Sequence, residues 1–256
     1  GEDELTRLRQ YATSITAGLD RVLLNERITA LERAKSDFLS IASHELRGPM
    51  TVIKGYLTML EGGALGEVSP KVQSVVPLLI SKADEVNWMV EQMIEASRLE
   101  EGRLALKKQI VDLVELTDIA VDGVKLLLGN HHLNVDQPQE AVEAEVDPDR
   151  FQIVIRNLLS NAAKYSPNGS DIDVKVRRDG TFAFVSVHDY GVGISKEDQG
   201  RLFKRFNRIE THTHVQGTGL GLWLSREIAR MHDGDLVVQS EIGRGSTFTL
   251  SVPINR

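Results

Sequence analysis

A long, uninterrupted helical periodicity near the N-terminus constrains the fold of this chain most strongly. From Leu5 to about Glu61 the only proline is Pro49, and apolar residues recur every three or four positions. This pattern predicts one very long helix or two fused ones. The apolar residues keep a heptad rhythm up to Val22 and follow a second register from Leu24. We therefore expect a coiled-coil lead-in with a register shift.

A second amphipathic helix is expected after a glycine-rich turn. Three glycines within residues 62–66 interrupt the first helix, and Ser69-Pro70 has the form of a helix N-terminus. Apolar residues then recur at helical spacing to about Leu99. Neither helix can bury its apolar stripe alone, so a dimeric four-helix bundle made of two such hairpins is the economical arrangement.

The character of the sequence changes after Gly102. Short β-type runs occur at 171–178 and 181–189, and they alternate with helical stretches near 112–128, 147–165 and 220–232. This mixture predicts an α+β two-layer sandwich. We accordingly divide the chain into a coiled-coil segment, a helical hairpin domain and an α+β domain, at 1–30, 31–101 and 102–256.

Composition limits the classes of function. The chain has no cysteine, which excludes disulfides and thiolate metal sites and favours the cytoplasm. Its net charge of −7 argues against nucleic acid as the main partner. No apolar run approaches the roughly 20 residues that span a bilayer. Because the chain starts at Gly1 and not at Met, we expect an upstream sensor domain outside it, and membrane anchoring stays open.

His44 is the candidate nucleophile of the first helix. On a helical wheel of about 100° per residue, His44 lies opposite an apolar stripe formed by Leu31, Phe38, Leu39, Ala42, Leu46, Ile53, Leu57 and Leu60. We therefore expect it to face solvent, as a surface residue or as a nucleophile. A carboxylate such as Glu45 can hold one ring nitrogen by a hydrogen bond and leave the other free to attack. Gly48, one turn further on, leaves the backbone open to a docking partner.

A polar strip borders the apolar face of the helix predicted near 147–165. Asn157, Asn161 and Lys164 fall within about 60° of one another on the helical wheel. Amide oxygens suit Mg²⁺, and a lysine can meet phosphate charge directly. Taken alone, most such strips belong to ordinary amphipathic helices with polar flanks.

Two glycine-rich segments accompany this strip. The segment 189-DYGVGIS-195 places a carboxylate at a strand end, next to glycines that let backbone approach a ligand. The segment 217-GTGLGL-222 enters a helix, whose free N–H groups and positive dipole end suit phosphate oxygens. Neither a P-loop nor the lysine and aspartate set of protein kinases is present.

The segment 35-KSDFLSIASHELRGPMTVIKGYLTML-60 resembles the dimerisation and phosphoacceptor domain of sensor histidine kinases. That family carries the motif Ser-His-Glu-Leu-Arg-Thr-Pro-Leu. The resemblance implies a homodimer that phosphorylates His44 from ATP and transfers the phosphoryl group to an aspartate of a response-regulator receiver domain. Where the family commonly has Thr or Asn, implicated in orienting water for dephosphorylation, this chain has Gly48. This difference puts phosphatase activity in doubt.

The C-terminal segments resemble the Bergerat-type ATP-binding fold shared by histidine kinases, Hsp90, MutL and type II topoisomerases. The resemblance implies that Asn161 binds Mg²⁺, that Asn157 supports it, and that Lys164 and Tyr165 contact the nucleotide. Asp189 would accept a hydrogen bond from the adenine amino group. The glycines that would shape the pocket are Gly191 and Gly193.

The stretch 201-RLFKRFNRIE-210 resembles the phenylalanine box of the kinase branch. Phe203 and Phe206 would anchor a mobile ATP lid at about 209–216, and Arg208 would face the γ-phosphate. Residues at the start of the phosphate-binding helix would complete the site, namely Gly217, Thr218, Gly219, Leu220 and Gly221.

Other interpretations stay open at this point. An ATPase clamp of the Hsp90 or MutL type uses the same pocket, although it would lack His44, Glu45 and the hairpin. A non-catalytic module could use the hairpin only for dimerisation. The pair His212 and His214 could suggest a metal site, but without a nearby cysteine or a second pair we favour solvated lid residues.

Overall fold

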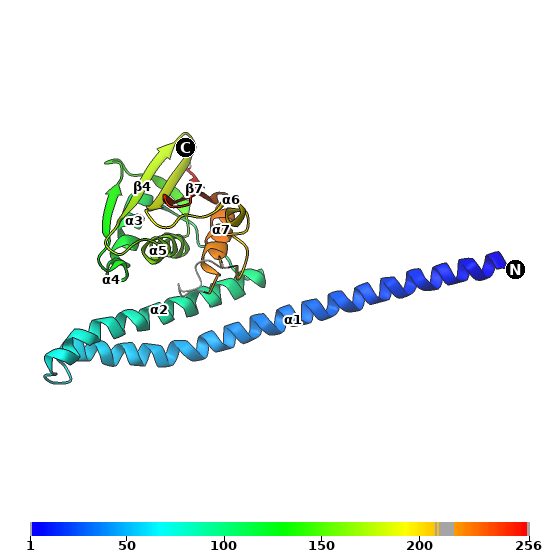
Figure 1. Ribbon diagram of the computed structural model, residues 1–256, viewed down its shortest axis with the longest axis horizontal. Helices are drawn as coiled ribbons and strands as arrows, with labels where there is room; N and C mark the ends of the chain where they lie inside the picture. The colour runs from blue at the N-terminus through cyan, green and yellow to red at the C-terminus, as the bar shows by residue number, and fades with distance from the viewer. Residues whose placement is uncertain (1, 208, 210–217, 255–256) are drawn as a thin grey trace.

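The computed structural model describes residues 2–207, 209 and 218–254, apart from the side chains of some residues in helices α1 and α4. Two long helices, α1 (Glu2–Glu61) and α2 (Pro70–Glu100), precede an α/β unit (Figure 1). The first helix continues through Pro49. Of the two predicted alternatives, the structure therefore shows one very long helix. Its N-terminal part extends well away from the rest of the chain (Figure 1).

The two helices form an antiparallel hairpin. Ser69 caps α2 by accepting a hydrogen bond from the Val72 amide, and Pro70 occupies the first turn, which confirms the predicted helix start. An ion pair of 2.6 Å between Lys54 Nζ and Asp84 Oδ1 joins the two helices. Helix α2 lies between α1 and the α/β unit (Figure 1), so it can contact both.

None of the described helices is both long enough and apolar enough to cross a membrane.

A five-stranded sheet forms the scaffold of the α/β unit. Its strands run in the order β2-β4-β5-β7-β6, where β2 is parallel to β4 and the other neighbours are antiparallel. A separate antiparallel pair joins β1 and β3. The strand bounds are β1 (Gln109–Asp112), β2 (His132–Asp136), β3 (Glu143–Val146), β4 (Asp171–Asp179), β5 (Phe182–Asp189), β6 (Asp235–Glu241) and β7 (Gly245–Pro253).

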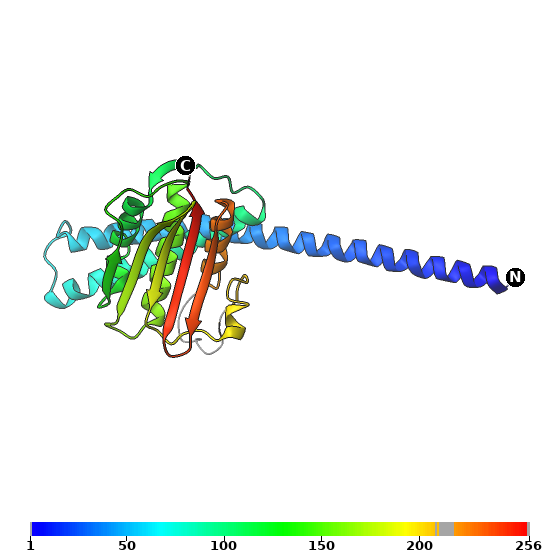
Figure 2. The same cartoon turned by 90° about the horizontal axis from the view of Figure 1, so that it is seen from above.

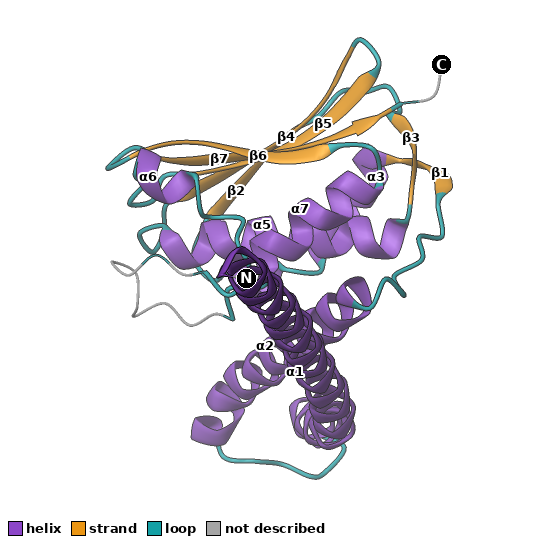
Figure 3. Cartoon of the chain, turned by 90° about the vertical axis from the view of Figure 1, so that its right-hand side faces the viewer, coloured by secondary structure: helices purple, strands orange, loops and turns teal. Residues whose placement is uncertain are grey.

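Helices cover one face of this sheet, while the described segments leave the other face open (Figures 2 and 3). This arrangement confirms the predicted two-layer sandwich. The helical stretch expected near 112–128 is divided at Gly123, which has a low helix propensity. The helices of the unit are α3 (Leu113–Asp122), α4 (Lys125–Leu128), α5 (Pro148–Tyr165), α6 (Lys196–Gln199) and α7 (Gly221–Met231).

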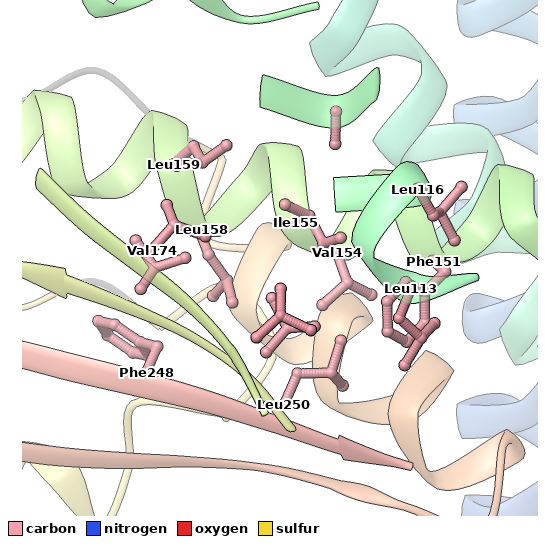
Figure 4. Packing of buried hydrophobic residues seen from close by; sticks show 14 of the residues in the cluster. Leu113, Leu116, Phe151, Val154, Ile155, Leu158, Leu159, Val174, Phe248 and Leu250 are labelled. Atoms are coloured by element: carbon pink, nitrogen blue, oxygen red, sulfur yellow. The ribbon is translucent and has the colours of Figure 1, made fainter. Parts of the chain in front are cut away.

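The core lies between the sheet and helices α3, α5 and α7. Alternate residues of β5 point inward, so Ala183, Val185 and Val187 are buried while their neighbours are not. These three side chains belong to the same buried cluster as an apolar stripe of helix α5. Figure 4 shows this stripe, formed by Phe151, Val154, Ile155, Leu158 and Leu159. Each such side chain contributes about 1.5–3 kcal/mol on burial. The packed stripe fixes the rotation of α5, and with it the direction of the polar strip.

Candidate functional site

A cavity opens between α5, the start of α7, the loop after β5 and the inner face of α2. Nine residues predicted from the sequence line it: Asn157, Asn161, Lys164, Tyr165, Asp189, Gly193, Thr218, Gly219 and Gly221. They come from segments far apart in the chain, and the fold brings them to one place.

Asn157 fixes the inner wall of the cavity. Its side chain is buried, and its Nδ2 donates a 2.9 Å hydrogen bond to Ser225 Oγ on α7. Gly221 lies against the same amide, since a Cβ at this position would collide with Asn157 Oδ1. The amide therefore holds α5 against the first turn of α7. Asn161 and Lys164 follow on the same side of α5 and are partly exposed to the cavity.

Asp189 ends strand β5 as a buried hydrogen-bond acceptor. Its side chain lines the cavity and is 4% exposed, and its Oδ1 accepts a 2.9 Å hydrogen bond from the Gly191 amide. Burial raises the pKa of this carboxyl above its ordinary value, although the Gly191 N–H and neighbouring His188 act in the opposite direction. A carboxyl held in this way can accept a hydrogen bond from an amino group in the cavity.

The loop after Asp189 requires glycine at two positions. A Cβ on Gly191 would collide with the Tyr165 carbonyl, and one on Gly193 would collide with the Glu241 carbonyl. Gly193 also has a φ of +71°, which L side chains rarely adopt. Gly191 does not line the cavity itself, but its close contact with α5 sets the position of the loop.

Helix α7 begins beside the cavity at Gly221, two residues after Gly219, whose φ is also +71°. Thr218 Oγ1 accepts a hydrogen bond from the Leu220 amide at 3.3 Å. The N-terminus of a helix offers free N–H groups and a positive dipole end to an anion. The side chain of Leu220 is fully buried in the core, so its part in the site is to anchor this turn.

The predicted lid region is only partly described. Phe203 packs against the core and carries the Arg226 guanidinium 4.7 Å from its ring centre, and its role as a lid anchor stays a prediction. Phe206, by contrast, is 42% exposed, has a φ of 54° and contacts the guanidinium of Arg205. Neither phenylalanine lines the cavity. The expectations for Arg208, Gly217, His212, His214 and the lid at 210–216 lie outside the described residues.

The predicted nucleophile lies on the hairpin. Glu45 is exposed on α1 and does not line the cavity, and the side chain of His44 is outside the described part of the structure. The direction expected for His44 from the helical wheel therefore stays a prediction. Gly48 has open space where a Cβ would lie.

Sequence reasoning missed a contribution from helix α2 to the cavity. Trp88, Met89 and Gln92 line it. Their spacing of one, three and four residues indicates one shared helix face. The same spacing is equally typical of a helix that packs only within a bundle. Trp88 is buried and carries the Arg156 guanidinium 4.6 Å from its ring centre.

Among the residues that the structure describes, no group of three or more His, Cys, Asp or Glu side chains could hold a metal ion. The amide oxygen of Asn161 is the hard oxygen donor that sequence reasoning proposed, and it lies one turn from Lys164.

Two family descriptions match this chain. Residues 34–102 match the His Kinase A (phospho-acceptor) domain, and residues 146–256 match the histidine kinase-, DNA gyrase B- and HSP90-like ATPase. The first match contains His44 and Gly48. The second contains every predicted residue of the cavity.

Individual relatives agree with these matches. The circadian input-output histidine kinase CikA of Synechococcus elongatus is 31% identical over 230 residues, covering 88% of this chain and 30% of that protein. The sensor histidine kinase MtrB of Mycobacterium leprae is 31% identical over 263 residues, covering 100% of this chain and 46% of that protein. The chain thus spans less than half the length of these relatives.

A solved structure shares the fold. Full-length ShkA in complex with AMPPNP superposes with a TM-score of 0.61 at 23% identity, covering 85% of this chain and 45% of that chain. At this identity the likeness concerns the fold alone.

Proposed function

Because the chain belongs to the sensor histidine kinases of two-component systems, we propose that it uses ATP to phosphorylate its own His44. It then passes the phosphoryl group to an aspartate of a response-regulator receiver domain. The observation that carries the proposal is the cavity that joins a buried carboxyl at Asp189 to the polar strip of Asn161 and Lys164. An ATP-dependent kinase needs one end of its site to hold the adenine and the other to hold the phosphates.

The two ends of the cavity suit the two ends of ATP. Asp189 accepts a hydrogen bond from the adenine amino group, Gly193 lies against the base, and Gly191 sets the position of this loop. Lys164 and the N-terminus of α7 meet the phosphates. Tyr165 and Asn157 complete the wall. The AMPPNP bound to the ShkA relative supports an adenine nucleotide as the ligand.

The residues present fit Mg²⁺. Among the neutral amides that line the cavity, Asn161 is the one proposed to bind the ion, and the described residues hold no cluster of three or more acidic, histidine or cysteine side chains that could do so. Mg²⁺ usually keeps several waters and binds through a few protein oxygens together with substrate phosphates. When bound, it would neutralise charge on the phosphates, and Arg208 would act on the γ-phosphate beside it.

The proposed chemistry has two balanced steps. A free ring nitrogen of His44 attacks the γ-phosphorus in line, the bond to the β–γ bridging oxygen breaks, and ADP leaves. Glu45 holds the other ring nitrogen and stabilises its proton. A carboxylate oxygen of the receiver aspartate then attacks the phosphorus, and the nitrogen–phosphorus bond breaks to restore His44. The protein contributes mainly positioning.

In this proposal residues 1–30 are a coiled-coil signalling helix that connects to an upstream sensor domain, and residues 31–101 are the dimerisation and phosphotransfer domain. Residues 102–256 bind ATP. Exposed apolar side chains on the hairpin, such as Ile53 and Leu79, support a second copy as the partner. We place the reaction in the cytoplasm, where ATP and receiver domains meet.

Labelling from γ-labelled ATP tests the proposal. Wild-type chain should become labelled and should lose the label to a receiver domain, whereas His44→Gln should bind nucleotide without labelling. His132→Gln, at an exposed position on β2, is the matched control and should label normally.

Three results would contradict the assignment. Persistent labelling of His44→Gln would exclude this histidine as the acceptor. Release of free phosphate without any labelling would favour an ATPase clamp. Failure to bind any adenine nucleotide would favour a non-catalytic module.

A further inference from the structure

One face of helix α2 is packed against the α/β unit. Glu85, Trp88, Gln92 and Ala96 recur at three- and four-residue spacing, so they share this face. Trp88, Gln92 and Ala96 are buried, and Glu85 is mostly buried. Trp88 stacks with Arg156 of α5 and Gln92 lines the cavity. The hairpin therefore forms part of the wall of the nucleotide site.

Three ion pairs reinforce the contact between α2 and the α/β unit. In each of them the carboxylate belongs to α2 and the cation belongs to the α/β unit. Glu95 Oε2 lies 3.3 Å from Arg150 Nε, Glu85 Oε1 lies 3.0 Å from Lys164 Nζ, and Glu100 pairs with Arg205. The acidic face of α2 is thus complementary in charge to the surface around the cavity.

The Glu85 pair involves a residue of the proposed phosphate site. Lys164 lines the cavity, and its side chain is 31% exposed while that of Glu85 is 15% exposed. Lys82 also pairs with Glu85 at 2.8 Å, and hydrogen bonds from Lys82 and Lys164 outweigh burial and lower the pKa of the Glu85 carboxyl. Glu85 is therefore a carboxylate at neutral pH. It forms an ion pair with the Lys164 ammonium group, which a bound phosphate would also need.

We propose that Glu85 and the nucleotide phosphates compete for Lys164, so that docking of α2 lowers the affinity for ATP. Coupling of this kind is reciprocal, and bound nucleotide weakens the docking by the same factor. The contact is an autoinhibitory one: the hairpin must release Lys164 before the site is complete. The inference rests on the proposed function, because it assigns Lys164 to the phosphates.

Nucleotide affinity of charge-neutral variants tests the competition. Glu85→Gln should bind MgATP and MgADP about fivefold more tightly than wild type, as expected for loss of a partly buried ion pair. Binding of adenosine, which has no phosphate, should not change. Glu91→Gln removes the same charge from an exposed position of α2 and should leave all affinities unchanged. Titration calorimetry of the whole chain gives each value.

A double substitution shows whether the effect passes through Lys164. Lys164→Met should weaken MgATP binding, and in that background Glu85→Gln should no longer tighten it. Equal tightening with and without Lys164 would overturn the competition, as would unchanged affinity in a Glu85→Gln chain that still labels His44. Absence of nucleotide binding in every variant would instead contradict the proposed function, and this inference with it.

Discussion

Asn157 on α5 and Ser225 on α7 are joined by a buried hydrogen bond of 2.9 Å. The bond links the helix that carries Asn161 and Lys164 to the helix whose N-terminus meets the proposed phosphates. Gly221 packs against the same amide. The contact of the Asn157 side chain with α7 thus sets the distance between Lys164 and the N-terminus of α7.

Ser225→Ala should lower both stability and nucleotide affinity. The substitution leaves Asn157 Nδ2 buried without this partner, which costs about 1–3 kcal/mol in unfolding free energy. Urea unfolding and calorimetric titration with MgADP measure the two effects. Ser74→Ala, at an exposed hydroxyl on α2, is the control and should change stability by less than about 0.5 kcal/mol. Equal stability of the two variants would show that the Asn157 bond is dispensable.

Gly191→Ala should displace the loop after β5. Its Cβ would collide with the Tyr165 carbonyl, and this backbone atom cannot rotate away as a side chain would. We expect a loss of about 1–3 kcal/mol in stability, as for overpacking elsewhere, together with weaker nucleotide binding. Gly200→Ala, whose Cβ would lie 3.4 Å from the nearest atom, is the matched control. Thermal unfolding that is identical for both variants would contradict the predicted collision.

Asp189→Asn should separate stability from binding. Burial raises the pKa of Asp189, so the folded state holds its proton more tightly than the unfolded state does. The stability linked to this carboxyl is present below the ordinary aspartate pKa, and it is lost as the pH rises through the raised value. At pH 7 the variant should therefore be at least as stable as wild type.

The same variant should bind ATP about tenfold more weakly, because an amide nitrogen replaces one acceptor oxygen. Unfolding free energies measured from pH 4 to pH 8, with calorimetric titration at pH 7, check both parts. A variant that unfolds more readily at pH 7 than at pH 4, relative to wild type, would reverse the predicted sign.

Asp147→Asn should destabilise the link between α5 and the segment that follows α2. Asp147 Oδ2 accepts from the Lys107 amide at 2.8 Å and from Arg150 Nη1 at 3.1 Å. Burial opposes ionisation, but these bonds outweigh it and lower the pKa of Asp147. Its contribution is therefore present above the ordinary aspartate pKa, and it is lost as the pH falls through the lowered value.

We expect Asp147→Asn to cost about 1–3 kcal/mol at pH 7 and progressively less in acid. Asp149→Asn changes an exposed carboxylate in the same helical turn and is the control. Chemical unfolding at several pH values gives the comparison. A difference between the two variants that grows as the pH falls would be inconsistent with this sign.

Gly48→Thr should add phosphatase activity to the kinase. A Cβ at Gly48 meets open space, so the side chain fits without displacing the helix. A hydroxyl one turn after His44 can orient water near the phosphorylated receiver. Loss of labelled phosphate from the receiver measures the gain. Gly55→Thr, at another open glycine of α1, should not alter this rate. Equal rates for both variants would exclude a role for position 48.

The sequence predicted elements whose signals are local. Ser69-Pro70 marks a helix start through cap chemistry, and strands β4 and β5 show the alternation of one buried face. The position of Asn161 and Lys164 at the edge of the apolar arc of α5 was predicted for the same reason. Each of these inferences needs only a few neighbouring residues and a known period.

Contacts between distant segments could not be predicted in this way. Asn157 has the same helical phase whether or not Ser225 lies opposite, and nothing local in the sequence pairs them. The periodicity of Trp88 and Gln92 shows that α2 buries a face, but it does not name the surface that covers it. Phe206 combines an exposed side chain with a positive φ, which is uncommon for an aromatic residue, and no local pattern in the sequence predicts either property.

The unbroken course of α1 has a mechanical consequence. A helix of 60 residues is a rod about 90 Å long, and it connects its far end to the turn that holds His44 without a flexible joint. Twist applied at one end must reach the other as rotation. Inserting one residue near residue 20 would turn the far end by about 100°, whereas inserting seven would almost restore its phase. If the extent of His44 labelling in such insertion variants follows the helical period, α1 transmits the signal by rotation about its own axis.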